Sequence, residues 1–159
     1  MRLYFLRHGR AVARGEWSGP DAERPLTEEG VELMRAEAQG LRRLGFDPTL
    51  IITSPYVRAA QTADIVAEHL DMRGRVLHDE RLAPGFDLEQ AERILAENEH
   101  ATSILLVGHE PDFSTAISDI TGGSDIVCKK GALARVDLPD HSVRRGSLVW
   151  LIPSGPLAG

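Results

Sequence analysis

Four short apolar runs along this chain are each followed by a segment with the spacing of an amphipathic helix. The runs have the length of buried strands and lie at residues 3–6, 50–53, 75–78 and 103–107. The helical segments begin near Thr27, Pro55, Asp87 and Pro111. Strands that alternate with helices form right-handed crossovers. The pattern therefore predicts an α/β three-layer sandwich, with a mostly parallel central sheet and helices on both faces.

The pattern changes in the last part of the chain. Two more strand-like runs, 132–138 and 147–152, have no helical segment between them. Strands joined by a short connection pair in antiparallel fashion, so we expect these two at one edge of the sheet.

Two helix starts carry clear local signals. Thr27 can cap a helix whose first turn holds Glu28 and Glu29, and acidic residues there are stabilised by the helix dipole. Ser54 precedes Pro55, a residue suited to the first helical position. We therefore expect the second helix to start at Ser54 and Pro55.

Composition sets the domain count and excludes several classes of protein. With 159 residues, 42% of them hydrophobic, the chain is predicted to form one domain over residues 1–153. Residues 154–159 look like a loose C-terminal tail. The single cysteine, Cys128, excludes an internal disulfide and suits a reducing cytoplasm. We see no membrane span of roughly 20 apolar residues and no signal peptide, so we expect a cytoplasmic protein.

Charge is distributed unevenly. The net charge of −6 argues against a broad nucleic-acid surface, because such surfaces are basic. Residues 1–24, in contrast, hold five arginines against three acidic residues. A small anionic group could bind there.

Polar residues follow each of the four predicted parallel strands. They are Arg7 and His8, Ser54 to Arg58, Glu80, and His109 with Glu110. Ligands of such sheets bind beyond the carboxyl ends of the strands, so we expect these residues to meet in one cleft.

These residue types suit a phosphoryl group. Arg7 and Arg58 offer forked donors for phosphate oxygens. His8 and His109 could each serve as nucleophile, acid, base or donor, and Glu80 as a proton donor to a leaving group. By position alone, either histidine could carry a covalent phosphate.

Rival chemistries fail on spacing. Cys128 lacks an arginine at the distance that a cysteine-based phosphatase needs, because Arg135 is one position too far. The chain has no phosphate-binding loop of the Gly-x4-Gly-Lys type, and His109-Glu110 is not followed by a second zinc-binding histidine. We therefore expect a metal-independent reaction without a cofactor.

The ordered motifs resemble the histidine phosphatase superfamily, also called phosphoglycerate mutase-like, and its short SixA-type phosphohistidine phosphatase branch. The resemblance rests on Leu6-Arg7-His8-Gly9, the segments 24–30 and 54–63, Glu80, and Gly108-His109-Glu110-Pro111.

The resemblance implies a role for each of these positions. His8 would be the nucleophile that becomes phosphorylated, while Arg7, Arg58 and His109 would hold the phosphoryl group. Glu80 falls where the family often keeps its proton donor, with Asp79 beside it as the alternative. Arg10 departs from the acidic or other polar residue of many small members, and either adds positive potential at the rim or faces solvent.

Three functions follow as hypotheses. The first is hydrolysis of phosphohistidine on a partner protein, favoured because no segment is long enough for a lid that would enclose a small molecule. The second is a phosphomonoesterase for small phosphate esters. The third, of another class, is a phosphate- or phosphoprotein-binding module without turnover.

Overall fold

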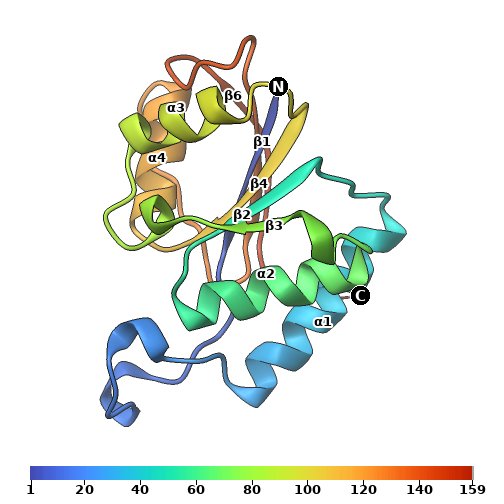
Figure 1. The fold of residues 1–159 in the computed structure, drawn as a ribbon, viewed down its shortest axis with the longest axis vertical. Coiled ribbons are helices and arrows are strands. Elements are labelled where there is room, and N and C mark those ends of the chain that lie inside the picture. Colours follow the sequence, from blue (N-terminus) through green and yellow to red (C-terminus); the bar gives the residue numbers. More distant parts are fainter. Residues whose placement is uncertain (159) are drawn as a thin grey trace.

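A six-stranded sheet with the strand order β3-β2-β4-β1-β5-β6 forms the centre of the computed structural model, which describes residues 1–158. The strands are β1 (Arg2–Arg7), β2 (Leu50–Thr53), β3 (Val76–His78), β4 (Ser103–Gly108), β5 (Leu133–Asp137) and β6 (Ser147–Ile152). The first four run parallel, and β5 is antiparallel to both β1 and β6 (Figure 1). The predicted parallel sheet with an antiparallel edge is confirmed.

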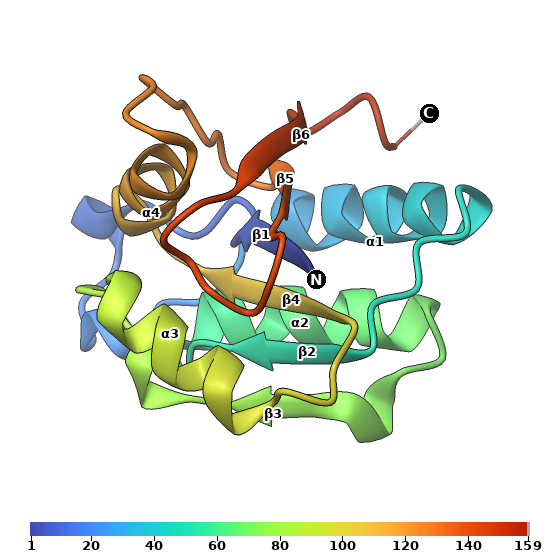
Figure 2. The same cartoon turned by 90° about the horizontal axis from the view of Figure 1, so that it is seen from above.

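Two helices cover each face of the sheet (Figure 2). They are α1 (Glu28–Arg43), α2 (Val57–His69), α3 (Leu88–Glu97) and α4 (Asp112–Thr121). Successive β1 side chains point to opposite faces, so Leu3 and Phe5 pack with α3 and α4, whereas Tyr4 and Leu6 pack with α1 and α2. The three predicted layers are therefore present. None of the helices within residues 1–158 is both long and apolar enough to cross a membrane.

The ends of three helices follow the local signals in the sequence. The Thr27 hydroxyl accepts a hydrogen bond from the Gly30 amide at 3.0 Å and caps α1. Asp87 and Gln90 form a reciprocal capping box at the start of α3. Gly122 ends α4 with a φ of 93°, a conformation that glycine adopts without steric cost.

The predicted start of the second helix is wrong by two residues. Helix α2 begins at Val57 after Tyr56, and no side chain caps it. Ser54 instead stays bound to β4 through its amide, which donates to the Val107 carbonyl at 2.9 Å, and its hydroxyl hydrogen-bonds His109.

The connection between β1 and α1 has more structure than its sequence indicates. It contains two short 3-10 helices, Arg14–Glu16 and Asp21–Glu23. An antiparallel bridge between Ala11 and Leu26 closes its base. We call residues 9–26 the arginine loop, and its second 3-10 helix brings Asp21 against Arg58 in the first turn of α2.

The C-terminal segment, expected to be loose, is packed over residues 154–158. The Ser154 hydroxyl donates to the buried carboxylate of Glu37 in α1 at 2.5 Å, and the Gly155 amide donates to the same oxygen. Leu157 is buried against the α1 side of the core. The segment was expected to be loose because its own sequence does not show that Glu37, on a distant helix, accepts its hydrogen bonds. Gly159 lies outside the described residues.

Candidate active site

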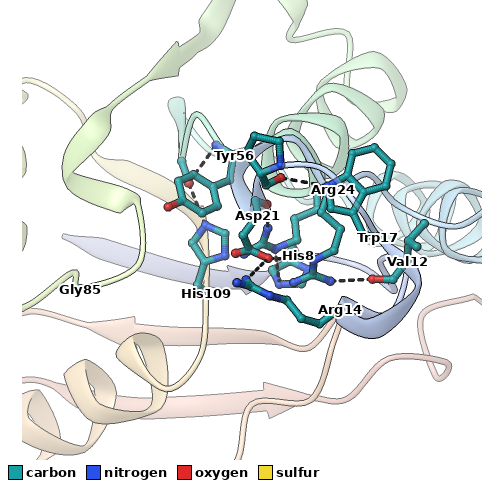
Figure 3. Close-up of polar contacts among 12 residues, drawn as sticks. His8, Val12, Arg14, Trp17, Asp21, Arg24, Tyr56, Gly85 and His109 are labelled. Atoms are coloured by element: carbon teal, nitrogen blue, oxygen red, sulfur yellow. Dashed lines mark hydrogen bonds and ion pairs between the residues drawn. The ribbon is translucent and has the colours of Figure 1, made fainter.

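The carboxyl ends of β1, β4 and β2 are neighbours in the sheet, and each delivers a side chain to one place (Figure 3). His8 follows β1, His109 follows β4, and Arg58 lies in the first turn of α2 beyond β2. The ring centroids of His8 and His109 are 5.3 Å apart. The sheet order thus brings together residues that are 50 positions or more apart in the sequence.

The hydrogen bonds of His8 assign its protons. Nδ1 lies 2.8 Å from the Gly9 carbonyl oxygen, which can only accept, so Nδ1 carries the hydrogen. Nε2 lies 3.2 Å from the Nε of Arg58, which can only donate. Nε2 therefore keeps its lone pair, as a nucleophilic nitrogen must.

Burial keeps this imidazole neutral. It is the largest influence on the pKa of His8, followed by the opposing hydrogen bond to Gly9 and the unfavourable charges of His109, Arg58 and Arg7. Together they lower the pKa from 6.5 to about 3. The neutral imidazole of His8, with an unprotonated Nε2, is therefore the stable form at neutral pH.

The backbone beside His8 is tied to α2. The Gly9 amide donates to the Thr62 hydroxyl at 3.1 Å, and that hydroxyl donates to the Arg58 carbonyl at 2.7 Å. A Cβ on Gly9 would lie 2.7 Å from the Met34 side chain, so glycine lets this turn pack against α1.

Arg58 is buried and uses three of its nitrogens. Nε faces His8, while Nη1 donates to the Asp21 carbonyl at 2.8 Å and Nη2 to the Asp21 carboxylate at 3.1 Å. The end of the guanidinium is thus held by Asp21. Its Nε edge faces the unprotonated Nε2 of His8.

Arg7, the last residue of β1, directly precedes His8. Its Nη1 donates to the Cys128 carbonyl at 2.9 Å, which fixes the guanidinium. Its buried Nε has no hydrogen-bond partner within residues 1–158. Arg7 also lowers the pKa of both histidines. These features leave donor capacity for an anion beside His8 and His109.

His109 is held by Ser54. Its Nε2 lies 2.8 Å from the Ser54 hydroxyl oxygen, and the Tyr56 ring packs edge-on at 5.2 Å. Its Nδ1 is buried without a hydrogen-bond partner in the described part of the chain. Burial, with a smaller effect from Arg58, lowers the pKa of His109 to about 4. When Nε2 accepts from the Ser54 hydroxyl, the hydrogen of the neutral ring is on Nδ1, which can then donate to an oxygen atom of a bound ligand.

Three other residues considered from the sequence form no hydrogen bond or ion pair with His8, Arg58 or His109 within residues 1–158. Glu80 is exposed on a 3-10 helix, Glu80–Leu82, and its side chain makes no hydrogen bond within residues 1–158. Asp79 is engaged by Arg81 at 2.6 Å, and hydrogen bonding from Arg81 lowers the pKa of Asp79. Arg10 pairs with the exposed Glu29 at 2.7 Å. Asp79 is therefore committed to Arg81, whereas the Glu80 carboxylate has no such partner within residues 1–158.

The structure adds a residue that the sequence did not single out. Asp21 forms ion pairs with Arg14 at 2.7 Å, Arg24 at 2.9 Å and Arg58 at 3.1 Å. Arg24 also donates to the Val12 carbonyl at 2.7 Å. Asp21 is one of only three acidic residues in the arginine-rich start of the chain, but that signal does not indicate its partners.

Within residues 1–158, no group of three His, Cys, Asp or Glu side chains could hold a metal ion.

The chain is similar to known proteins in both sequence and fold. Residues 3–84 match the histidine phosphatase superfamily (branch 1). An uncharacterised protein of Picosynechococcus is 40% identical over 117 residues, which cover 70% of this chain and 68% of that protein. The phosphohistidine phosphatase SixA of Escherichia coli is 26% identical over 94% of this chain and 92% of its own length. A solved structure of the protein histidine phosphatase SixA with tungstate has a TM-score of 0.86, at 26% identity and 97% coverage of both chains.

Proposed function

Because this chain belongs to the histidine phosphatase superfamily, we propose that it hydrolyses phosphohistidine on a partner protein through a phosphorylated His8. The observation that carries the proposal is the pairing of His8: its Nδ1–H donates to the Gly9 carbonyl, and its unprotonated Nε2 accepts from Arg58. In the first step the Nε2 lone pair attacks phosphorus and the leaving group departs. In the second step water attacks, and the Nε2–P bond breaks.

Three side chains would stabilise the transferring group. Arg7 and Arg58 supply guanidinium donors, and His109 supplies the ring nitrogen that has no partner within residues 1–158. Positioning and charge stabilisation supply most of the catalysis in phosphoryl transfer. A group that is dianionic at neutral pH fits this cationic setting.

Two features support a protein substrate over a free metabolite. The relative with 26% identity over 94% of this chain is a phosphohistidine phosphatase. The connection between β3 and β4 contains only the Glu80–Leu82 turn and α3, so it has no spare helix to enclose a small molecule. Specific metabolite sites bury most of the ligand surface, whereas a side chain that projects from a protein needs only an opening.

The nucleophile is tested by phosphoenzyme trapping. We expect an acid-labile, base-stable phosphoryl label on the wild type and none on His8→Ala, because no other group replaces a covalent nucleophile. His100→Ala is the matched control, since the His100 side chain is 98% exposed. Label that persists in His8→Ala would place the nucleophile elsewhere, and a wild type that binds phosphate without turnover would indicate a binding module.

The substrate is tested by comparing kcat/KM for a phosphohistidine protein with that for the best small phosphate ester. A small ester preferred by about tenfold or more, equal to about 1.4 kcal/mol in the barrier, would refute the protein substrate but leave the His8 chemistry intact. EDTA should leave turnover unchanged, and strong inhibition would contradict the metal-independent reaction.

Glu80 is proposed as the proton donor for ester substrates. An alkoxide leaving group needs a proton, whereas an imidazole that is already protonated does not. Glu80→Gln should therefore reduce hydrolysis of alkyl phosphates more than hydrolysis of phosphohistidine. Equal reductions for both substrates would contradict this role.

A further inference from the structure

Asp21 places a carboxylate against the guanidinium that faces the nucleophile. Arg58 contacts His8 Nε2 through its Nε and the Asp21 carboxylate through its Nη2. The close-up shows Asp21 gathered with Arg14, Arg24 and the two histidines (Figure 3), and its charge also influences His109. A negative group thus lies inside a site otherwise built for anions, and phosphate binding alone does not explain it.

The carboxylate has room for one more partner. Arg14 and Arg24 approach Oδ1, whereas Oδ2 accepts a hydrogen bond from Arg58 alone among residues 1–158. The Asp21 side chain is 23% exposed, in contrast to the 4% of Arg58. The Asp21 carboxylate is therefore partly open to solvent, whereas the guanidinium beside it is buried.

The charge of Asp21 is fixed by its neighbours. Partial burial by itself would raise the pKa of Asp21, but the hydrogen bond from Arg24 and the charge of Arg58 outweigh burial. The result is a pKa of about 2. An ionised carboxylate only accepts hydrogen bonds, so Asp21 cannot serve as the proton donor of the first step.

An accepting carboxylate at this position discriminates between leaving groups. The oxygen of a departing ester gains negative charge, which a neighbouring carboxylate repels. The ring of a phosphohistidine that is protonated on its second nitrogen is cationic and presents an N–H donor. A carboxylate attracts this ring by charge and by a charge-assisted hydrogen bond.

Building on the proposed function, we propose that Asp21 is a specificity-determining residue, whose carboxylate accepts a hydrogen bond from the ring N–H of the protonated phosphohistidine substrate. The first step then balances without an added acid. The His8 Nε2–P bond forms and the substrate P–N bond breaks. The electron pair stays on the departing nitrogen, and the substrate ring leaves as neutral imidazole with its N–H in place.

The test compares two small probes, phosphoimidazole and p-nitrophenyl phosphate, as a ratio of kcat/KM values. Asp21→Asn keeps the shape of the side chain and removes its charge. We expect the ratio of phosphoimidazole to ester to fall at least about tenfold, as loss of a hydrogen bond to a charged group predicts. The matched control is Glu23→Gln in the same 3-10 helix, which should leave the ratio unchanged. Asp21→Glu should restore part of it.

A probe without the N–H makes the test independent of whether the variants fold. In 1-phospho-3-methylimidazolium a methyl group replaces the ring hydrogen but the positive charge remains. For each probe, the wild-type rate is divided by the rate of uncatalysed hydrolysis of that probe. This rate enhancement should be at least about tenfold smaller for the methylated probe than for phosphoimidazole.

Two results would overturn the inference. An unchanged ratio in folded Asp21→Asn would reduce Asp21 to a positioning residue for Arg58, and equal wild-type rates on both imidazole probes would exclude the hydrogen bond. The proposed function is judged separately, from the phosphoenzyme on His8 and from the wild-type preference between a phosphohistidine protein and esters. The role of Asp21 is read only from changes relative to those values.

Discussion

Replacing Arg58 with lysine keeps a positive charge in the site but removes the planar guanidinium. Arg58 donates from Nε to His8 Nε2 at 3.2 Å, from Nη1 to the Asp21 carbonyl at 2.8 Å and from Nη2 to the Asp21 carboxylate at 3.1 Å. An ammonium is a single point charge with three donors. A lysine cannot replace the contacts with His8, the Asp21 carbonyl and the Asp21 carboxylate. It also cannot donate two parallel hydrogen bonds to a phosphoryl group.

The size of the effect follows from burial. Arg58 is 4% exposed, so water cannot take the place of the missing donors. Loss of one preorganised donor to developing charge reduces the rate by about 10²–10³, or about 2.7–4 kcal/mol. We expect a loss of this size for Arg58→Lys, because Arg7 and His109 remain.

The assay is kcat/KM with an aryl phosphate, together with rapid-quench measurement of phosphoenzyme formation and thermal unfolding. The matched control is Arg93→Lys, since the Arg93–Glu89 pair is exposed on α3 and such pairs contribute little. The control should stay within about twofold of the wild type. Turnover of folded Arg58→Lys at the wild-type rate would refute the argument from guanidinium geometry.

Three further outcomes are expected. Ser54→Ala leaves His109 Nε2 without its 2.8 Å partner; kcat/KM should fall about tenfold with loss of one hydrogen bond, and an unchanged value would contradict this positioning. Below pH 6.5 the unfolded state protonates His109 before the folded state does, whose pKa is about 4. The free energy of unfolding, measured in urea, should therefore decrease as the pH is lowered from 6.5 to about 4. In His109→Asn this decrease should be smaller by up to about 1.4 kcal/mol per pH unit, and equal slopes in both proteins would refute this. Ser154→Ala removes a donor to buried Glu37 and should reduce the free energy of unfolding by about 1–3 kcal/mol. An unchanged free energy would show that this contact of the C-terminal segment does not stabilise the fold.

The layers and the sheet could be predicted because each element is encoded locally. The runs at 3–6 and 103–107 have the length and composition of strands buried on both faces, and the intervening helices show apolar faces and caps. Connection rules then restrict the topology to a few arrangements. The start of α2 was predicted wrongly because Ser54 hydrogen-bonds His109, which is 55 positions away, and no local pattern encodes that contact.

The sequence by itself determined which strand ends would meet, because parallel strands place His8, Arg58 and His109 at one edge of the sheet. Only the tertiary structure decided which histidine nitrogen is free, that Glu80 is exposed, and that Asp21 lies on Arg58. These features depend on hydrogen bonds and ion pairs a few ångströms long. The arginine loop has no periodic pattern, so its path, and with it the position of Asp21, is set by contacts with distant parts of the chain.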